Sequence, residues 1–327
     1  MREAAASPRR AGWARNRFVA AFIAMATVIG LAGVIGAGDA AARVNGTQVG
    51  KQEFWVNGCG MPNVKVRAWK RPGNYKTAIL LDGMRAQYDY SGWEINTNVQ
   101  EMVRSGVNVV EPIGGPASFY SDWDAPSNFN NQPYRYTWNC VITKTLIREL
   151  DRRGFRGPSG RYAIAGLSSG GNAALVIGAQ NRHNFDRVAS LSGYNFLNAP
   201  GMRTALRLAM FDVDPKPWNI DSMWGPPWSP RWISNDPFMN INRMHGMKVF
   251  IGSGNGLFGQ YNSLPNVFDD LFKGSTLEVL AFTQAKAFEA AAFVQGLPLM
   301  TYYSNGTHAW GYWQDMLWNA KNRGFFR

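Results

Sequence analysis

The residues best suited to chemistry lie in one short stretch of the 327-residue chain. Gly166, Ser168 and Gly170 form a Gly-x-Ser-x-Gly motif, with β-prone residues before it and an apolar run at residues 172–177 after it. A strand, a sharp turn and a helix in this order force the central serine into a strained backbone and expose its hydroxyl above the sheet. Ser168 is therefore the candidate nucleophile. Because the motif also arises by chance in glycine-rich chains, an ordinary turn is the alternative.

A serine nucleophile needs a base, and the chain has three histidines. His183 lies between the helix after Ser168 and the next expected strand, and His245 directly precedes a strand. We expect both to be structural. His308 follows an expected strand, in the loop before the final helix, where a catalytic base is expected.

The third group of such a site is an acid that holds the base in the correct tautomer. When the serine lies at a strand-to-helix turn, the acid comes between the serine and the histidine in the chain. The carboxylates in the interval beyond residues 247–251 are Asp269, Asp270, Glu278 and Glu289. Position alone leaves the first three nearly equivalent, whereas the last is expected to be a solvated helix charge.

Two backbone N–H groups are expected to form an oxyanion hole. In this fold one belongs to the residue after the nucleophile and the other to the loop after an early strand. Ser169 supplies the first. The loop Asp82-Gly83-Met84-Arg85 follows an apolar run, so the Met84 N–H is the second candidate, whatever its side chain does.

Apolar runs that alternate with helical segments predict how these residues are positioned. A mostly parallel sheet with helices on both faces is expected, which is the α/β-hydrolase fold. A tryptophan- and proline-rich section at residues 196–245 interrupts the alternation and predicts a lid or binding insertion. The expected strands are residues 64–69, 78–81, 107–110, 162–165, 187–191, 247–251 and 299–303, and the main helices are residues 141–152, 267–295 and 310–322.

The first 42 residues have the composition of a secretory signal peptide. Five arginines precede an uncharged stretch at residues 18–38, and Ala40, Ala41 and Ala42 offer a small-residue cleavage site. Because the uncharged stretch is long enough to span a membrane, an uncleaved anchor is the alternative. We expect an exported chain with one domain over residues 43–327.

Charge and cysteine content limit the binding partners and the kinds of site that we expect. The net charge is +12, but the basic residues are scattered and form no long block or known nucleic-acid module. An anionic cell-envelope surface fits this charge as well, and no nucleic-acid partner is expected. Cys59 and Cys140 are the only cysteines, and in an exported chain they predict one disulfide. With two cysteines and three histidines, no metal site is expected.

Several further motifs occur in a fixed order between about residues 64 and 313. They are LLDGMRAQYDYSGWEINT at residues 80–97, SFYSDW at 118–123, GLS at 166–168, MWGP at 223–226, NDP at 235–237 and NGTHAW at 305–310. Together they closely resemble the antigen 85-type mycolyltransferases of the mycolic-acid-bearing bacterial envelope.

The resemblance implies an acyltransferase that needs no cofactor. It would move mycoloyl groups between trehalose mycolates and onto arabinogalactan, with Ser168 as the acylated residue and His308 as the base. In the family the acid lies in a Leu-Glu pair ten residues before a phenylalanine. Here Glu278 follows Leu277 and stands ten residues before Phe288, so the resemblance selects Glu278.

The resemblance also implies where the substrate binds and where the protein acts. The family residues that hold the trehalose headgroup fall on Asp82, Arg85 and Trp310. A carboxylate and a guanidinium can hydrogen-bond sugar hydroxyls, and an indole offers an apolar face to a sugar ring. Without the resemblance, a salt-bridged loop and a packed tryptophan explain these residues equally well. The expected protein is a monomer that is secreted or held at the cell envelope.

Departures from the family leave two other functions open. The residues after the nucleophile are Ser169, Gly170 and Gly171, Ala309 follows the histidine, and Ser253 stands where some members have a cysteine. These differences bear on the choice of acceptor. The alternatives are a secreted carboxylesterase, in which water accepts the acyl group, and a non-catalytic envelope-binding protein that keeps the fold.

Overall fold

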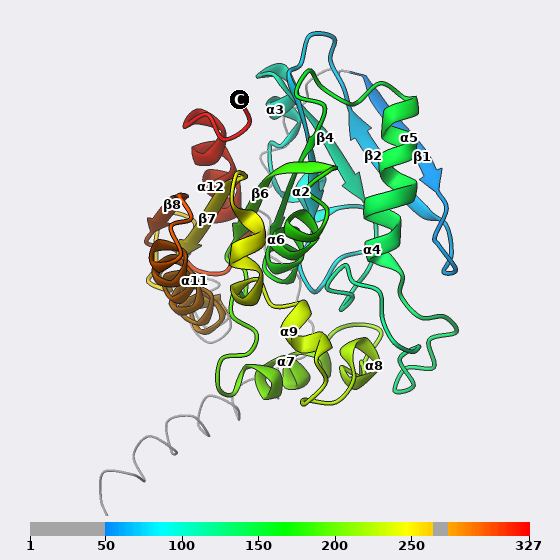
Figure 1. Cartoon of the computed structure of the whole chain (residues 1–327), viewed down its shortest axis with the longest axis vertical. Coiled ribbons are helices and arrows are strands. Elements are labelled where there is room, and N and C mark those ends of the chain that lie inside the picture. The colour runs from blue at the N-terminus through cyan, green and yellow to red at the C-terminus, as the bar shows by residue number, and fades with distance from the viewer. Residues whose placement is uncertain (1–49, 264–273) are drawn as a thin grey trace, which may run out of the picture.

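The computed structural model describes residues 50–263 and 274–327, and its centre is an eight-stranded sheet. The strand order is β1-β2-β4-β3-β5-β6-β7-β8 (Figure 1). The β1–β2 and β2–β4 pairs are antiparallel, and all the other neighbours are parallel. The strands are β1 (Lys51–Val56), β2 (Val64–Trp69), β3 (Lys76–Leu81), β4 (Val107–Pro112), β5 (Tyr162–Leu167), β6 (Phe185–Leu191), β7 (Lys248–Gly254) and β8 (Leu299–Ser304).

The central strands are buried from end to end. Every residue of β3, β4, β5 and β6 is buried, which is why their sequences are nearly continuous apolar runs rather than alternating ones. β2 alternates more clearly, as expected for a strand near one edge. The chain has the expected α/β-hydrolase fold.

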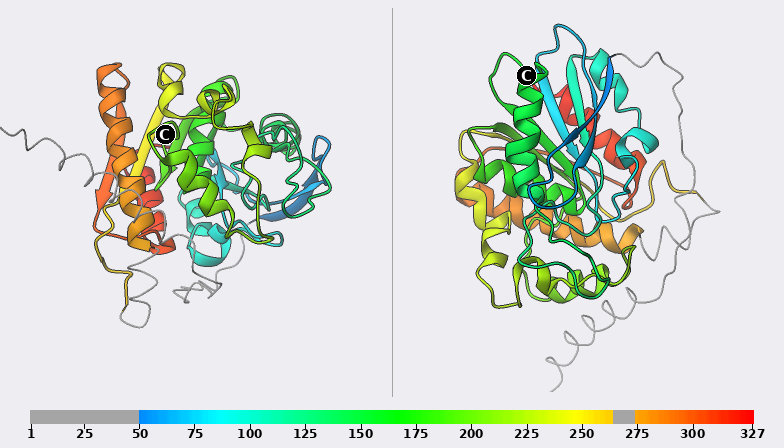
Figure 2. Two further views of the ribbon diagram at one scale, coloured as in Figure 1. Left: turned by 90° about the horizontal axis from the view of Figure 1, so that it is seen from below. Right: turned by 90° about the vertical axis from the view of Figure 1, so that its right-hand side faces the viewer.

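Helices cover both faces of the sheet. Leu146, Leu175 and Phe288 pack in the core on one face, and Trp93 and Met316 pack in the core on the other. Figure 2 (right) shows α5 in green and α12 in red on opposite sides of the strands. The helices are α2 (Gly92–Asn96), α3 (Gln100–Arg104), α4 (Trp138–Cys140), the π-helix η1 (Val141–Thr145), α5 (Leu146–Arg152), α6 (Ser169–Gln180), α11 (Thr276–Val294) and α12 (Trp310–Asn322).

Most of the short helices in the section at residues 196–245 lie at one end of the molecule, and the last of them packs against α6 and α11 (Figure 1). They are α7 (Met202–Met210), α8 (Asp221–Trp224), α9 (Arg231–Ser234) and the 3-10 helix η2 (Phe238–Met244). Trp218, Trp224 and Trp232 are almost completely buried and belong to the main core on one face of the sheet, whereas Trp228 is 83% exposed. Most of the tryptophans in this section therefore stabilise it.

The disulfide expected from the sequence is present. Cys59 and Cys140 are bonded, with their Cα atoms 6.2 Å apart, and the bond links the β1–β2 connection to the start of the α4–α5 helical segment. All seven predicted strands are found, but β1 was not predicted. The predicted helix at residues 310–322 coincides with α12. Of the helix predicted at residues 267–295, the described part is α11.

Three expectations concern residues outside the described part. The signal peptide and its alternative, an anchor, fall within residues 1–42, and Asp269 and Asp270 also lie outside it. Within residues 50–263 and 274–327, every helix is too short or too polar to cross a membrane.

Candidate active site

Ser168 occupies a sharp turn between β5 and α6. Its φ and ψ are 52° and −127°, a conformation that a residue with a side chain rarely adopts. The neighbouring glycines are required by close packing: a Cβ on Gly166 would lie 2.2 Å from the Gly170 oxygen, and one on Gly170 would lie 2.1 Å from the Asp82 oxygen. The local sequence therefore folds as the strained turn that the motif predicts.

His308 and Glu278 form the central polar contact of the site. The Nδ1 atom of His308 lies 2.7 Å from Oε2 of Glu278, which is completely buried in the first turn of α11. The other carboxylate oxygen, Oε1, accepts hydrogen bonds from the Ser192 hydroxyl at 2.6 Å, the Ser253 hydroxyl at 3.0 Å and the Gly254 N–H at 2.5 Å. These donors replace the water that a buried carboxylate loses. The carboxylate is thus fixed, and with it the imidazole.

Two aromatic rings hold the imidazole from different directions. Trp313 meets the His308 ring edge to face, with centroids 4.9 Å apart, and Tyr194 lies nearly parallel to it at 6.4 Å. The Tyr194 phenol also interacts with the Ser168 hydroxyl, which can hydrogen-bond to it. Tyr194 therefore contacts both the candidate nucleophile and the candidate base. Because Nδ1 of His308 is held by the acid, Nε2 is the nitrogen that can exchange a proton with substrate.

The loop after β3 lies directly against the Ser168 turn. A Cβ on Gly83 would lie 2.9 Å from Cδ1 of Leu167 and 3.3 Å from Cβ of Ser168. The Met84 carbonyl is held by the Ala117 N–H at 2.9 Å, which fixes the loop. The Ser169 N–H is the first of α6 and has no acceptor within the helix. Both expected oxyanion donors thus lie on elements that meet at Ser168.

Asp82 is buried, with only 3% of its surface exposed, and it holds the start of α2. Its carboxylate oxygens accept from the Gly92 N–H at 3.1 and 3.2 Å. Burial raises the pKa of Asp82 to about 7, although hydrogen bonds from Ser91 and the backbone oppose this. Glu111 is close by and fully buried, and burial together with the Asp82 charge raises its pKa well above the ordinary value.

The other two expected headgroup residues differ in their surroundings. The Arg85 side chain is 63% exposed and pairs with Asp212, just after α7, at 2.9 Å. Trp310, at the start of α12, is partly exposed and meets Trp93 and Trp313 edge to face, at 5.7 and 5.1 Å. Arg85 is therefore held by an ion pair on the surface, whereas Trp310 is packed between two other rings.

The alternative acid that the structure describes has a different role. Glu289 lies on α11 and interacts with Lys286 at 2.5 Å and with the Tyr303 hydroxyl at 3.1 Å. It is partly exposed, as expected for a helix charge. Asp269 and Asp270 lie outside the described residues.

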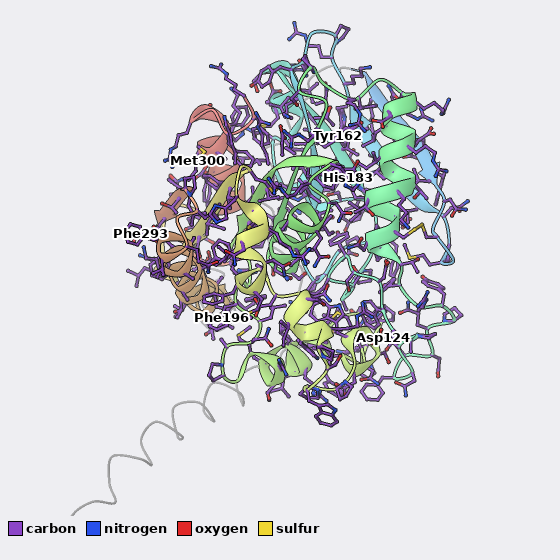
Figure 3. All side chains as sticks on the ribbon, in the orientation of Figure 1. Asp124, Tyr162, His183, Phe196, Phe293 and Met300 are labelled. Atoms are coloured by element: carbon purple, nitrogen blue, oxygen red, sulfur yellow. A yellow bond between two sulfur atoms is a disulfide. The ribbon has the colours of Figure 1, made fainter. Side chains whose placement is uncertain are left out.

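Neither of the other histidines lies at the site. His183 is exposed in the turn after α6, at the end of that helix opposite Ser168 (Figure 3). His245 ends η2, and its carbonyl accepts from Arg182. Across residues 50–263 and 274–327, no three His, Cys, Asp or Glu residues gather in a way that could hold a metal ion.

Comparison with known proteins defines the family. Residues 60–323 match the family described as putative esterase. The chain is 33% identical over 308 residues to the diacylglycerol acyltransferase/mycolyltransferase Ag85C of Mycobacterium leprae (strain TN), which covers 92% of this chain and 89% of that protein. It is 36% identical over 262 residues to Ag85C of Mycobacterium avium, which covers 79% and 72%. The chain belongs to the antigen 85-type family of esterases.

Solved structures show that the fold is shared more widely than the antigen 85-type family. The crystal structure of Mycobacterium tuberculosis MPT51 superposes with a TM-score of 0.70 at 21% identity, covering 85% of this chain and 99% of MPT51. The serine hydrolase FphF of Staphylococcus aureus superposes with a TM-score of 0.61 at 12% identity, covering 84% and 99%. At these identities the likeness concerns the fold alone.

Sequence reasoning missed two residues that touch this site. Ser192 and Tyr194 follow β6, the strand next to the one that carries Ser168. The positive φ of Ser192, 50°, turns its hydroxyl to Glu278. The available signal was the small residues Ser190, Ser192 and Gly193 at the carboxyl end of a parallel strand, where functional loops gather.

Proposed function

We propose that this protein is an exported acyltransferase that moves mycoloyl groups from trehalose monomycolate to a second trehalose monomycolate or to arabinogalactan. The names of its antigen 85-type relatives support acyl transfer of this class. The observation that carries the proposal is the 2.7 Å contact of His308 with Glu278. Ser168, in its strained turn, is linked to this pair through Tyr194, which lies along the His308 ring and interacts with the serine hydroxyl. This arrangement activates a hydroxyl nucleophile without a metal or cofactor.

The reaction has two halves. Ser168 attacks the donor ester, and Nε2 of His308 takes the serine proton while Glu278 stabilises the imidazolium. The N–H groups of Met84 and Ser169 stabilise the oxyanion. The imidazolium then gives its proton to the departing trehalose, which leaves a mycoloyl ester on Ser168. In the second half a sugar hydroxyl loses its proton to His308 and attacks that ester, and Ser168 departs and regains the proton.

We propose that Arg85 and Trp310 bind the trehalose headgroup. Arg85 is exposed and can exchange Asp212 for sugar hydroxyls, and the partly exposed indole can support a sugar ring. Asp82 is also a headgroup candidate, but its carboxylate already holds the backbone of α2, so it would act mainly by shaping the loop. Residues 196–245 would cover the acyl chain as a lid. The expected disulfide-bonded, secreted monomer is part of the proposal.

The test is acyl transfer from trehalose monomycolate, or a shorter acyl-trehalose, with transferred acyl and free acid quantified together. Mature protein is compared with Ser168→Ala and with Ser105→Ala, a control at the end of α3. Trehalose diester that depends on Ser168 and not on Ser105 supports transfer. Free acid alone would favour a carboxylesterase. Absence of both products with folded protein would favour a binding protein.

A further inference from the structure

Tyr194 lies at the candidate active site but has no role in the reaction proposed above. It lies three residues beyond β6 and is 5% exposed, so its hydroxyl is inside the site rather than in solvent. Its ring lies nearly parallel to the His308 ring, with an interplanar angle of 16°. Its phenol interacts with the Ser168 hydroxyl, and the charges of Glu278 and Arg85 both reach it. Tyr194 is therefore next to both the candidate nucleophile and the candidate base.

The order of the strands places Tyr194 on a particular side of Ser168. In the sheet, β3 lies on one side of β5, and β6, β7 and β8 lie on the other. The Met84 loop follows β3, so the oxyanion is held on that side. Tyr194 follows β6 and His308 follows β8, so both lie on the opposite side. That side is where the leaving alcohol departs and where the acceptor alcohol enters, because His308 exchanges a proton with each of them.

We propose that Tyr194 is a catalytic residue that donates a hydrogen bond on the alcohol side of Ser168, supporting the departing and the incoming sugar oxygen. This inference rests on the acyl transfer proposed above. It assigns to one residue the preference for a sugar hydroxyl over water.

The chemistry requires no additional proton carrier. When the sugar hydroxyl attacks the acyl-enzyme, its proton goes to Nε2 of His308, the new carbon–oxygen bond forms, and Ser168 leaves with the proton that His308 returns. Tyr194 keeps its own proton throughout. Burial raises the pKa of Tyr194 above its ordinary value, so the phenol stays neutral and remains a donor. Water makes little use of this contact because it has no sugar ring to hold its oxygen next to the phenol.

The leaving group provides the test. A 4-nitrophenyl ester releases a stable anion that needs no hydrogen bond, whereas a trehalose ester releases a poor leaving group that does. Tyr194→Phe removes the hydroxyl and keeps the ring on His308. Because one hydrogen bond to a reacting oxygen is lost, we expect about a tenfold fall in acyl transfer to trehalose and in the ratio of transfer to hydrolysis. We expect the acylation rate with the 4-nitrophenyl ester to stay within about twofold.

Control measurements separate this inference from a structural role and from the proposed function. Tyr194→Leu also removes the ring and is expected to slow both substrates, because His308 loses a packing partner. If Tyr194→Phe slows both substrates equally, or changes neither, the inference is wrong. If the wild type hydrolyses esters but does not transfer, the proposed function is wrong. The inference is then tested on an alkyl ester against the 4-nitrophenyl ester, where a selective loss on the alkyl ester supports it and an equal effect overturns it.

Discussion

The carboxylate of Glu278 uses its two oxygens for two purposes. Oε2 contacts His308 at 2.7 Å, and Oε1 accepts from Ser192 and the Gly254 N–H. The proposed acid is therefore anchored by groups after β6 and at the end of β7, while the proposed base comes from the loop after β8. Because the anchors are independent of the base, the position of Glu278 is set before His308 is charged.

This arrangement predicts a large effect of Glu278→Gln on catalysis. The amide keeps the size of the side chain but cannot stabilise the imidazolium, and it can hold His308 in the wrong tautomer. We expect kcat for acyl transfer to fall by about 10²–10⁴-fold. The matched control is Glu289→Gln on the same helix, which should leave kcat unchanged. Full activity of Glu278→Gln in a steady-state assay would remove this acid from the mechanism.

The ion pair between Arg85 and Asp212 predicts that substitutions in it change KM for acyl-trehalose. In the free protein its guanidinium pairs with Asp212, so a sugar headgroup must compete with that carboxylate. We expect Arg85→Ala to raise KM for acyl-trehalose and Asp212→Asn to lower it, each by about two- to fivefold, because the Arg85 side chain is largely exposed and such ion pairs are weak. Arg152→Ala removes an arginine whose exposed ion pair, with Glu149 on α5, does not involve Asp212, and it is the control that should leave KM unchanged. KM is measured for each variant at two salt concentrations. If Arg85→Ala and Asp212→Asn both keep the KM of the wild type, Arg85 takes no part in headgroup binding.

The Trp310 side chain can be displaced by a substitution at a neighbouring residue, Gly92. A Cβ on Gly92 would lie 2.1 Å from the Trp310 ring, so Gly92→Ala must displace the indole. Alanine itself is well accepted in a helix such as α2. We expect a higher KM for acyl-trehalose and little change in the hydrolysis of a 4-nitrophenyl ester. If Gly92→Ala changes KM by the same factor for both substrates, Trp310 serves packing rather than headgroup binding.

The sequence was sufficient for the parts of the site that depend on local geometry. The turn at Ser168 requires small neighbours, and the loop before α12 that carries His308 follows a strand, so motif and order predicted where both residues lie in the fold. The acid could not be located in this way, because its identity depends on which turn of α11 faces His308. Glu278 was selected only by resemblance to a family.

Other features were missed because tertiary contacts determine them. β1 has no strong apolar alternation and is held as a strand by pairing with β2. Tyr194 reads as an ordinary loop residue, and its place beside His308 follows from the neighbouring positions of β6, β7 and β8 in the sheet. Such side-by-side placement of strands is not encoded by any local pattern.

The disulfide predicts a loss of stability on removal. The bond closes 81 residues of chain, and by the chain-entropy relation it stabilises the fold by about 4 kcal/mol. We expect the double variant Cys59→Ser, Cys140→Ser to unfold at lower urea concentration. The control is the wild type in a reducing buffer, which should shift by a similar amount. A urea midpoint that does not move would show that the disulfide contributes nothing to global stability.

Asp82 predicts that stability falls as pH rises. Its pKa in the folded protein is about 7, against an ordinary value of 3.8, so between these values the folded state binds more protons than the unfolded state. Below about pH 4 the group is neutral in both states and has no effect. As pH rises from about 4 to 7 the unfolded state loses this proton first, so the free energy of unfolding falls, by up to roughly 4 kcal/mol once Asp82 is ionised in both states above pH 7. Asp82→Asn keeps an acceptor for the Gly92 N–H but cannot ionise. We therefore expect this variant to be more stable than the wild type at pH 8 and nearly equal to it at pH 4.

Urea unfolding at pH 4 and pH 8 tests this expectation for Asp82→Asn. The control is Asp89→Asn, which changes an exposed carboxylate. A difference between Asp82→Asn and the wild type that is the same at both pH values would mean that Asp82 is ionised throughout, stabilised by the start of α2.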